Sequence, residues 1–156
     1  MEFLPNLAAR FSKKPKIMKR TAKAHWTGNL NEGKGEISSQ STVLNQTPYS
    51  FKTRFESGIG TNPEELIAAA HAGCFTMSVS AALGQSGFSA NDLNTEATLE
   101  VDLVNLMITG IHLDLTASLI DGVSADLFQA IAEGAKANCI VTKALNVPIT
   151  LNVLYK

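Results

Sequence analysis

An uncharged stretch, Leu66–Leu83, is the feature of this sequence that most constrains the fold. A helix start lies just before it, because Asn62 suits the N-cap and Pro63 suits the first helical position. Glu64 and Glu65 then suit the positive end of the helix dipole. A helix that is apolar around its whole circumference has no face for water. The sequence therefore predicts a long helix here that is buried on all sides.

A membrane span is the alternative for this helix, since roughly 20 apolar residues are enough to cross a bilayer. The stretch is rich in alanine and serine, however, contains His71, and begins with acids rather than lysines. We therefore favour a buried helix of a soluble protein, and we expect a cytoplasmic protein with no membrane partner.

Length and charge narrow the class of protein further. A chain of 156 residues has the size of one domain. Its charged fraction of 17% is below the usual quarter, which leaves little polar surface and favours an oligomer. The net charge of −1 provides no electrostatic footprint for nucleic acid, so no nucleic-acid partner is expected.

The first segment, Met1–Ile17, differs in composition from the remaining sequence because it is basic and nearly free of acids. It has no apolar core of signal-peptide length, so secretion is not indicated. We expect a flexible leader, either introduced by cloning or part of an upstream extension, with an organelle-targeting peptide as the alternative. A single domain then covers residues 18–156.

The rest of the chain alternates between strand and helix patterns. A second helix begins at the N-cap Ser124 and frays near Asn138, and a further turn follows at Val141–Leu145. This order of elements predicts the α+β class with antiparallel sheet. The strands that we expect are Thr21–Gly28, Glu36–Ser41, Tyr49–Phe55, a hairpin of Leu93–Leu103 with Met107–Leu119, and a final strand over Val147–Tyr155.

The two cysteines, Cys74 and Cys139, are the first candidates for chemistry. Two cysteines do not make a disulfide scaffold, and free cysteine is often only a small buried hydrophobe. Cys139, however, lies at an expected helix boundary in a locally polar setting, whereas Cys74 lies within the long helix. A nucleophile held still and a second thiol free to approach it need such an arrangement.

A nucleophilic cysteine must be a thiolate, and burial alone disfavours the charged form. The long helix contains no cation after Glu65, so one must come from elsewhere. Arg54, on the polar face of the strand before the helix, is the nearest in sequence, and its guanidinium can bind a thiolate and a carboxylate together. Glu64 could be that carboxylate, but ten residues of helix place it about 15 Å from Cys74. A contact therefore needs a bridging arginine or a glutamate from a second chain.

Other catalytic or metal sites have less support. His71 lies three residues before Cys74 on the same helix face, and could be a base or half of a zinc site. Zinc needs three or four protein ligands, whereas His25 and His112 lie on separate expected strands. We favour packing with a local hydrogen bond for His71. No nucleophile-elbow motif of a serine hydrolase occurs, and Gly28–Gly35 is read as a hairpin turn rather than a phosphate loop.

Three motifs in order, TRFE, TNPEEL and AAHAGCF, make the sequence resemble the OsmC/Ohr family of osmotically inducible and organic-hydroperoxide-resistance proteins. The similarity is to the OsmC branch and runs from about Ala24 to the C-terminus. The segment KANCIVTKAL around the second cysteine is also similar to the family. The resemblance implies an intertwined homodimer whose sheets enclose the long helices and whose sites lie at the dimer interface.

The resemblance also implies roles for the candidate residues. Cys74 would be the peroxidatic cysteine and Cys139 the resolving one, joined as a disulfide during turnover. Arg54 would activate the thiolate and Glu64 would orient the arginine. The implied activity is a cysteine-based peroxidase that reduces organic hydroperoxides and, as a further substrate, hydrogen peroxide. No metal or organic cofactor is implied; an external thiol reductant, such as a lipoyl-type dithiol, completes the cycle.

A different class of function remains as the alternative. In it, the chain forms a non-enzymatic ligand-binding or stress-associated dimer whose cysteines are packed and inert. Apolar residues near the site, Phe55, Phe75 and Met77, could favour bulky organic peroxides, but ordinary core packing accounts for them equally well.

Overall fold

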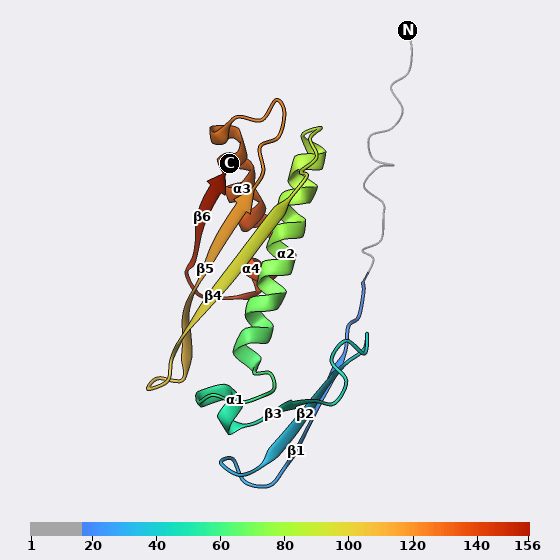
Figure 1. Ribbon diagram of the computed structural model, residues 1–156, viewed down its shortest axis with the longest axis vertical. Coiled ribbons are helices and arrows are strands. Elements are labelled where there is room, and N and C mark those ends of the chain that lie inside the picture. The colour runs from blue at the N-terminus through green and yellow to red at the C-terminus, as the bar shows by residue number, and fades with distance from the viewer. Residues whose placement is uncertain (1–16) are drawn as a thin grey trace.

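The computed structural model describes residues 17–156, and the expected leader lies outside this part of the chain except for its last residue. The expected α+β class is confirmed: residues 17–156 form two three-stranded sheets and four helices (Figure 1). In order, the elements are β1 (Ala22–Thr27), β2 (Lys34–Ser39), β3 (Thr47–Tyr49), α1 (Phe51–Phe55), α2 (Pro63–Gln85), β4 (Leu93–Asp102), β5 (Met107–Ala117), α3 (Ala125–Asn138), α4 (Ile140–Ala144) and β6 (Ile149–Tyr155).

The C-terminal sheet has the order β4-β5-β6. The β4–β5 hairpin is antiparallel, as its alternating sequence predicts. β6, however, pairs with β5 in parallel, with Leu113 opposite Leu151, so the expectation of a wholly antiparallel sheet is wrong here. The reason is the connection: α3 and α4 carry the chain back along the sheet before β6 begins, and such a helical crossover joins parallel strands.

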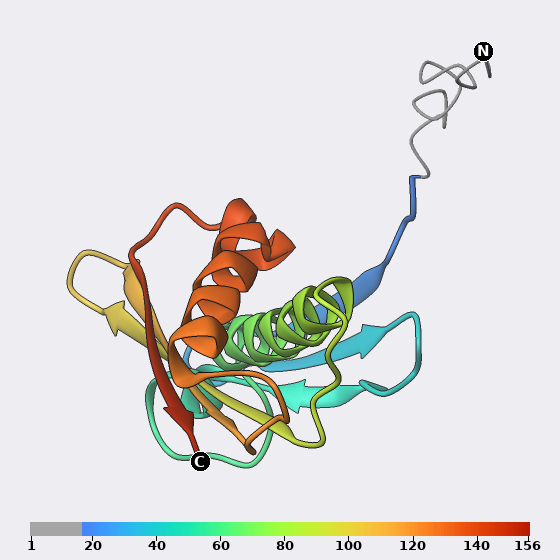
Figure 2. The ribbon, with the colours of Figure 1, turned by 90° about the horizontal axis from the view of Figure 1, so that it is seen from above.

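One face of this sheet packs against α2 and α3 and forms the core (Figure 2). Alternate side chains of β5 point inward and are almost completely buried, whereas the residues between them are only half-buried. In addition, the rings of Phe128 on α3 and Tyr155 on β6 stack with centroids 4.3 Å apart. The buried core residues include Ile111, Leu113, Leu115 and Ala117 from β5, Phe75, Val79 and Leu83 from α2, and Phe128, Ala132 and Ala135 from α3.

Helix α2 begins where the sequence predicts. The Asn62 side chain accepts a hydrogen bond of 2.8 Å from the backbone N–H of Glu65, and Pro63 is the first helical residue. The helix passes through Gly84 and ends at Gln85. The chain changes direction at Gly87, whose positive φ of 83° is a conformation that suits glycine.

The burial of α2 differs from the prediction. Only one stripe of the helix is buried in this chain, made of His71, Phe75, Val79 and Leu83. The opposite side is open, and the Met77 side chain there is 75% exposed. By length and composition alone α2 could cross a membrane, a property that core helices of soluble proteins share. An apolar helix with one open side is incompletely packed within a single chain.

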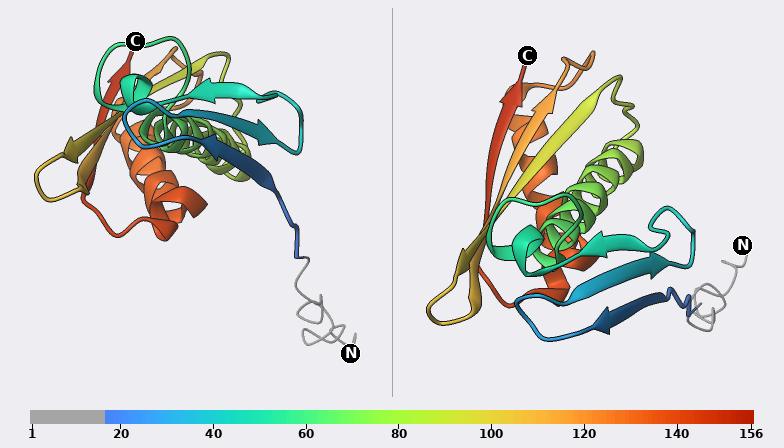
Figure 3. Two further views of the ribbon diagram at one scale, coloured as in Figure 1. Left: turned by 90° about the horizontal axis from the view of Figure 1, so that it is seen from below. Right: turned by 60° about the horizontal axis from the view of Figure 1, so that its bottom comes forward.

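The N-terminal sheet, β1-β2-β3, stands away from the main body of the chain (Figure 3). Its β1–β2 connection is a tight turn, as we expected, in which the Asn29 side chain accepts hydrogen bonds from the backbone of Asn31 and Glu32. Gly35 lies beneath the rings of Trp26 and Tyr49, and a Cβ there would collide with both rings. β1 is exposed along nearly its whole length, so this sheet also lacks a packing partner among residues 17–156.

The strand expected over Tyr49–Phe55 is wrong for most of its length. β3 ends at Tyr49, and the short helix α1 follows. Ser50 and Thr53 form a capping box: the Thr53 backbone N–H donates to Ser50 Oγ at 3.2 Å, and the Ser50 N–H donates to Thr53 Oγ1 at 2.8 Å. Such local bonds compete with strand pairing and favour a helix start. Arg54 therefore lies on a helix, not on a strand.

Candidate active site

The two thiols meet where α2 passes the junction of α3 and α4. Cys74 lies near the middle of α2 and is half-buried, while Cys139 is completely buried, and both are free cysteines. Cys139 is the C-cap of α3 and the N-cap of α4, so the expected helix break at this residue is confirmed. Its surroundings are part of the hydrophobic core rather than polar, because Ala135, one turn earlier, points into the same core.

The pKa of the Cys74 thiol is below its ordinary value. Burial, the largest single influence, acts to raise this pKa, because it disfavours the thiolate. Hydrogen bonds to the sulfur together outweigh burial and favour the charged form. The groups that make these bonds are the Cys139 side chain and the backbone N–H groups of Val141 and Ile140. The Ser78 hydroxyl donates to the backbone carbonyl oxygen of Cys74, at 2.9 Å.

The first turn of α4 is the part of this site that the sequence did not reveal. Backbone N–H groups at the start of a helix have no partner within the helix, and here those of Ile140 and Val141 are directed to Cys74. No side-chain hydrogen bond caps α4, which leaves these donors available to the sulfur. Backbone donors carry no residue signature, so sequence gives no signal for them. Ser78, four residues after Cys74, could have been found from helical spacing.

Arg54 and Glu64 form a second cluster at the start of α2. Arg54 Nε and Nη2 donate to Glu64 Oε1 at 2.9 and 2.6 Å. The Arg54 guanidinium also lies over the Phe55 ring, 5.1 Å from its centroid. The side chains are 46% and 21% exposed, and Glu64 Oε2 is buried without a hydrogen-bond partner among the described residues. The predicted pairing of this arginine with this glutamate is therefore seen within one chain.

The two clusters do not touch in the part of the chain that the structure describes. Across residues 17–156, no hydrogen bond or ion pair joins Arg54 or Glu64 to either cysteine. Helix geometry explains the gap, because Glu64 in the first turn is about 15 Å along the axis from Cys74. The role of Arg54 in activating Cys74 thus stays a prediction, and it needs a contact that one chain alone does not make.

His71 occupies the buried stripe of α2, one turn before Cys74. Its imidazole is completely buried, and Nε2 shares a hydrogen bond of 2.8 Å with Thr142 Oγ1 on α4. Burial lowers the pKa of this histidine, so that the ring is neutral near pH 7. The expected packing with a local hydrogen bond is what the structure shows. Over residues 17–156, no group of three or more histidine, cysteine, aspartate or glutamate side chains is placed to hold a metal ion.

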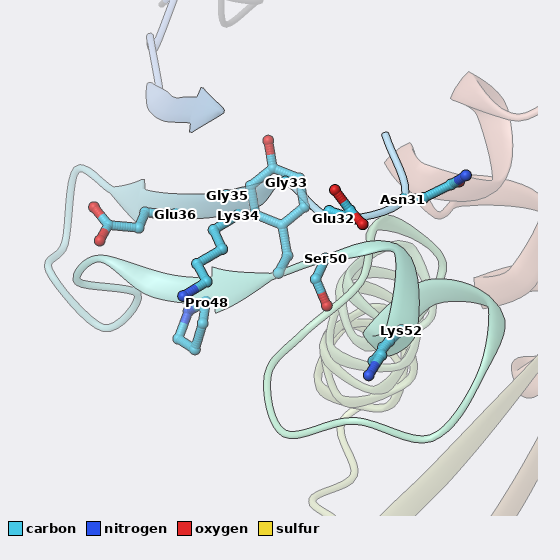
Figure 4. A pocket seen from close by; sticks show the side chains of 10 residues that line it. Asn31, Glu32, Gly33, Lys34, Gly35, Glu36, Pro48, Ser50 and Lys52 are labelled. Carbon is cyan, nitrogen blue, oxygen red and sulfur yellow. The ribbon is translucent and has the colours of Figure 1, made fainter. Parts of the chain in front are cut away.

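Two of the cavities lie close to α1, where it follows the N-terminal sheet. The larger, of about 490 Å³, is lined by residues of β2, β3 and α1 that include Lys34, Glu36 and Lys52 (Figure 4). A smaller one, of about 270 Å³, has Arg54 in its wall. Its other lining residues are mostly apolar or aromatic: Trp26, Leu30, Tyr49, Ser50, Phe51, Phe55 and Pro63.

Comparison with known proteins places this arrangement in a family. The sequence profile of the OsmC-like proteins matches residues 56–153. The chain is 45% identical to the peroxiredoxin OsmC of Escherichia coli strain K12 over 135 residues, which are 85% of this chain and 94% of that protein. It has the same identity and coverage with the peroxiredoxin OsmC of Shigella flexneri.

Solved structures confirm the fold. The chain matches the organic hydroperoxide resistance protein OhrB of Bacillus subtilis with a TM-score of 0.61 and 21% identity, covering 87% of this chain and 98% of OhrB. It matches an organic hydroperoxide resistance protein of Elizabethkingia anophelis with a TM-score of 0.67 and 24% identity, covering 91% and 100%. These distant structures share the α+β arrangement described above.

Proposed function

Because the chain belongs to the OsmC-like protein family, we propose that it is a thiol-dependent peroxidase that reduces organic hydroperoxides, with hydrogen peroxide as a further substrate. The observation that carries this proposal is the environment of Cys74, a half-buried thiol whose pKa is lowered beside a second free thiol. A lowered pKa raises the share of thiolate at neutral pH, and the thiolate is the nucleophile.

The chemistry proceeds in two steps at the thiols. The Cys74 thiolate attacks one oxygen of the peroxide, the O–O bond breaks, and the departing oxygen takes a proton and leaves as an alcohol or as water. Cys74 is then a sulfenic acid, R–SOH. The Cys139 thiol condenses with it, the S–O bond breaks, and a disulfide and one water form. An external dithiol, such as a lipoyl-type compound, reduces the disulfide and is itself oxidised. No metal or organic cofactor takes part.

The proposal includes a homodimer in which Arg54 and Glu64 of one chain approach Cys74 of the other. Three features of the single chain support it. The open side of α2 is apolar, with Met77 75% exposed, and the N-terminal sheet stands away from the body. The arginine–glutamate pair and the thiols are also separated along α2. A second copy could cover the apolar side and complete the site, and Arg54 would then stabilise the thiolate and the departing oxygen.

The compartment follows from the same chemistry. A cycle that needs free thiols and a thiol reductant suits a reducing environment, so we propose that the protein acts in the cytoplasm. No nucleic acid or membrane takes part in this function. Hydroperoxide, the reductant and a second copy of the chain are the partners.

Peroxide consumption tests the function. Purified protein is mixed with cumene hydroperoxide, tert-butyl hydroperoxide or hydrogen peroxide, with dihydrolipoamide as the reductant, and peroxide loss is followed in time. The unaltered protein should consume the organic peroxides catalytically, and Cys74→Ser should not. No consumption with any peroxide, by folded protein whose thiols are free, would instead favour the non-enzymatic ligand-binding dimer.

A further inference from the structure

The contact between α2 and α4 decides how the donors of α4 are held against Cys74. α4 has five residues, which is too short to be a stable helix by itself. It lacks a side-chain cap at its start, so its position depends on tertiary contacts. Its residues are also largely at the surface, since Ile140, Lys143 and Ala144 are exposed. A short, exposed helix of this kind needs a specific anchor if its first turn is to stay in place.

His71 provides that anchor. Within residues 17–156, the bond between His71 Nε2 and Thr142 Oγ1 joins a side chain of α2 directly to a side chain of α4. At one end of this bond, the completely buried imidazole is packed in the core one turn before Cys74. At the other end, Thr142 directly follows Ile140 and Val141, whose N–H groups face the Cys74 sulfur. The bond therefore joins the two elements close to the reacting atom.

The state of the imidazole fits this role. Burial lowers the pKa of His71, so the ring is neutral and adds no charge beside the thiolate. Nδ1 has no hydrogen-bond partner among the described residues, so Thr142 is the imidazole's polar contact there. A buried polar side chain with a single partner depends on that partner. Loss of the threonine hydroxyl would therefore leave both nitrogens unpaired.

We propose that His71 is a positioning residue, which through Thr142 holds the first turn of α4 so that its backbone N–H groups stabilise the Cys74 thiolate. The same bond fixes Cys139, the residue just before α4, next to Cys74. That this serves peroxide reduction rests on the proposed function. The positioning itself does not, because it concerns the thiolate of the resting protein.

The test is the thiol pKa of Cys74 in matched threonine variants. Thr142→Val removes the hydroxyl and keeps the shape of the side chain, whereas Thr142→Ser keeps the hydroxyl. Reduced protein is alkylated with iodoacetamide over a range of pH, and mass spectrometry of peptides follows Cys74 separately from Cys139. Thr142→Val should raise the pKa of Cys74 and slow its alkylation at neutral pH about tenfold, the change that one pKa unit produces. Thr142→Ser should alkylate like the unaltered protein.

A second threonine–histidine pair provides the control. Thr150 Oγ1 shares a hydrogen bond of 2.6 Å with His112 Nδ1 on the outer face of the C-terminal sheet. Thr150→Val removes this bond away from the cysteines and should leave the alkylation of Cys74 unchanged. If Thr142→Val alkylates like the unaltered protein, or if Thr142→Ser slows as much as Thr142→Val, the proposal is overturned.

The histidine side of the bond gives an independent pair of variants. If Thr142→Val does not fold, His71→Phe removes the bond from α2, while His71→Gln places an amide where Nε2 was. A higher pKa of Cys74 in His71→Phe than in His71→Gln supports the positioning role, and equal values overturn it. Because alkylation involves no peroxide, a normal thiol pKa pattern in a protein without peroxidase activity would count against the proposed function alone.

Discussion

Acid should destabilise the folded chain through His71. The imidazole is completely buried and burial lowers its pKa from the ordinary 6.5, whereas in the unfolded chain it titrates near that value. Between the folded pKa and 6.5, the unfolded state binds a proton that the folded state does not. The free energy of unfolding therefore rises with pH in this window, and the contribution of His71 to it is lost as pH falls below 6.5. The slope approaches about 1.4 kcal/mol per pH unit, the value for one proton.

Urea unfolding at a series of pH values measures this slope. The unaltered protein is compared with His71→Gln, which keeps an amide near the Nε2 position but does not titrate. Both proteins are measured at one fixed concentration, because the unfolding of a dimer depends on protein concentration. The difference between the two free energies of unfolding removes the contributions that the two proteins share. This difference in the free energy of unfolding should be constant above pH 6.5 and should change below pH 6.5. Profiles that stay parallel below 6.5 would refute the reasoning.

Three further substitutions test the site and the proposed dimer. Arg54→Ala should raise the pKa of Cys74 and slow peroxide reduction while the protein stays folded; an unchanged rate in a peroxide assay would remove Arg54 from thiolate activation. Cys139→Ser should complete one turnover and then allow Cys74 to over-oxidise to the sulfinic acid, visible by mass spectrometry; sustained turnover with a dithiol would show a different recycling route. Met77→Lys places a charge on the open side of α2 and should shift the proposed dimer towards monomer in sedimentation. The control, Gln129→Lys on the exposed side of α3, should leave the oligomeric state unchanged. A dimer unaffected by Met77→Lys would exclude this side of α2 as the interface.

The elements that sequence predicts well are those with a local signature. Asn62 and Pro63 mark the start of α2, and the alternation in β4 and β5 marks their hairpin. The direction of β6 was not predictable in this way, because alternation shows which side chains share a face and says nothing of strand direction. The strand prediction over Phe51 and Phe55 was wrong for a related reason. The two residues fit the alternation of a strand, but they also lie one helical turn apart, and in α1 their ring centroids are 4.9 Å from each other.

The burial of α2 shows a different limit. Apolar composition around the whole helix predicts that every side will be covered, but it does not say by which chain. One chain covers the stripe that contains His71 and Phe75, and it leaves the side with Met77 open. The sequence prediction of all-round burial therefore fails within one chain and could hold only for an assembly.

The sequence predicted which side chains belong to the candidate site, but it did not predict the backbone N–H groups that take part. The thiol pair, Arg54 and Glu64 were candidates from the residues themselves, and the resemblance to the family implied their roles. The structure brings the members of each pair together. Whether the two pairs form one site stays a prediction. The donors of Ile140 and Val141 depend on how α4 is placed against α2, which follows from tertiary packing rather than from local residue preferences.

The redox state of the cysteines after a single exposure to peroxide tests the central claim most directly. Fully reduced protein is mixed with one equivalent of an organic hydroperoxide, the remaining thiols are blocked, and the peptides are identified by mass spectrometry. We predict a disulfide between Cys74 and Cys139 within one chain, formed with consumption of the peroxide. Free thiols at both cysteines in a folded protein, with the peroxide intact, would contradict the account.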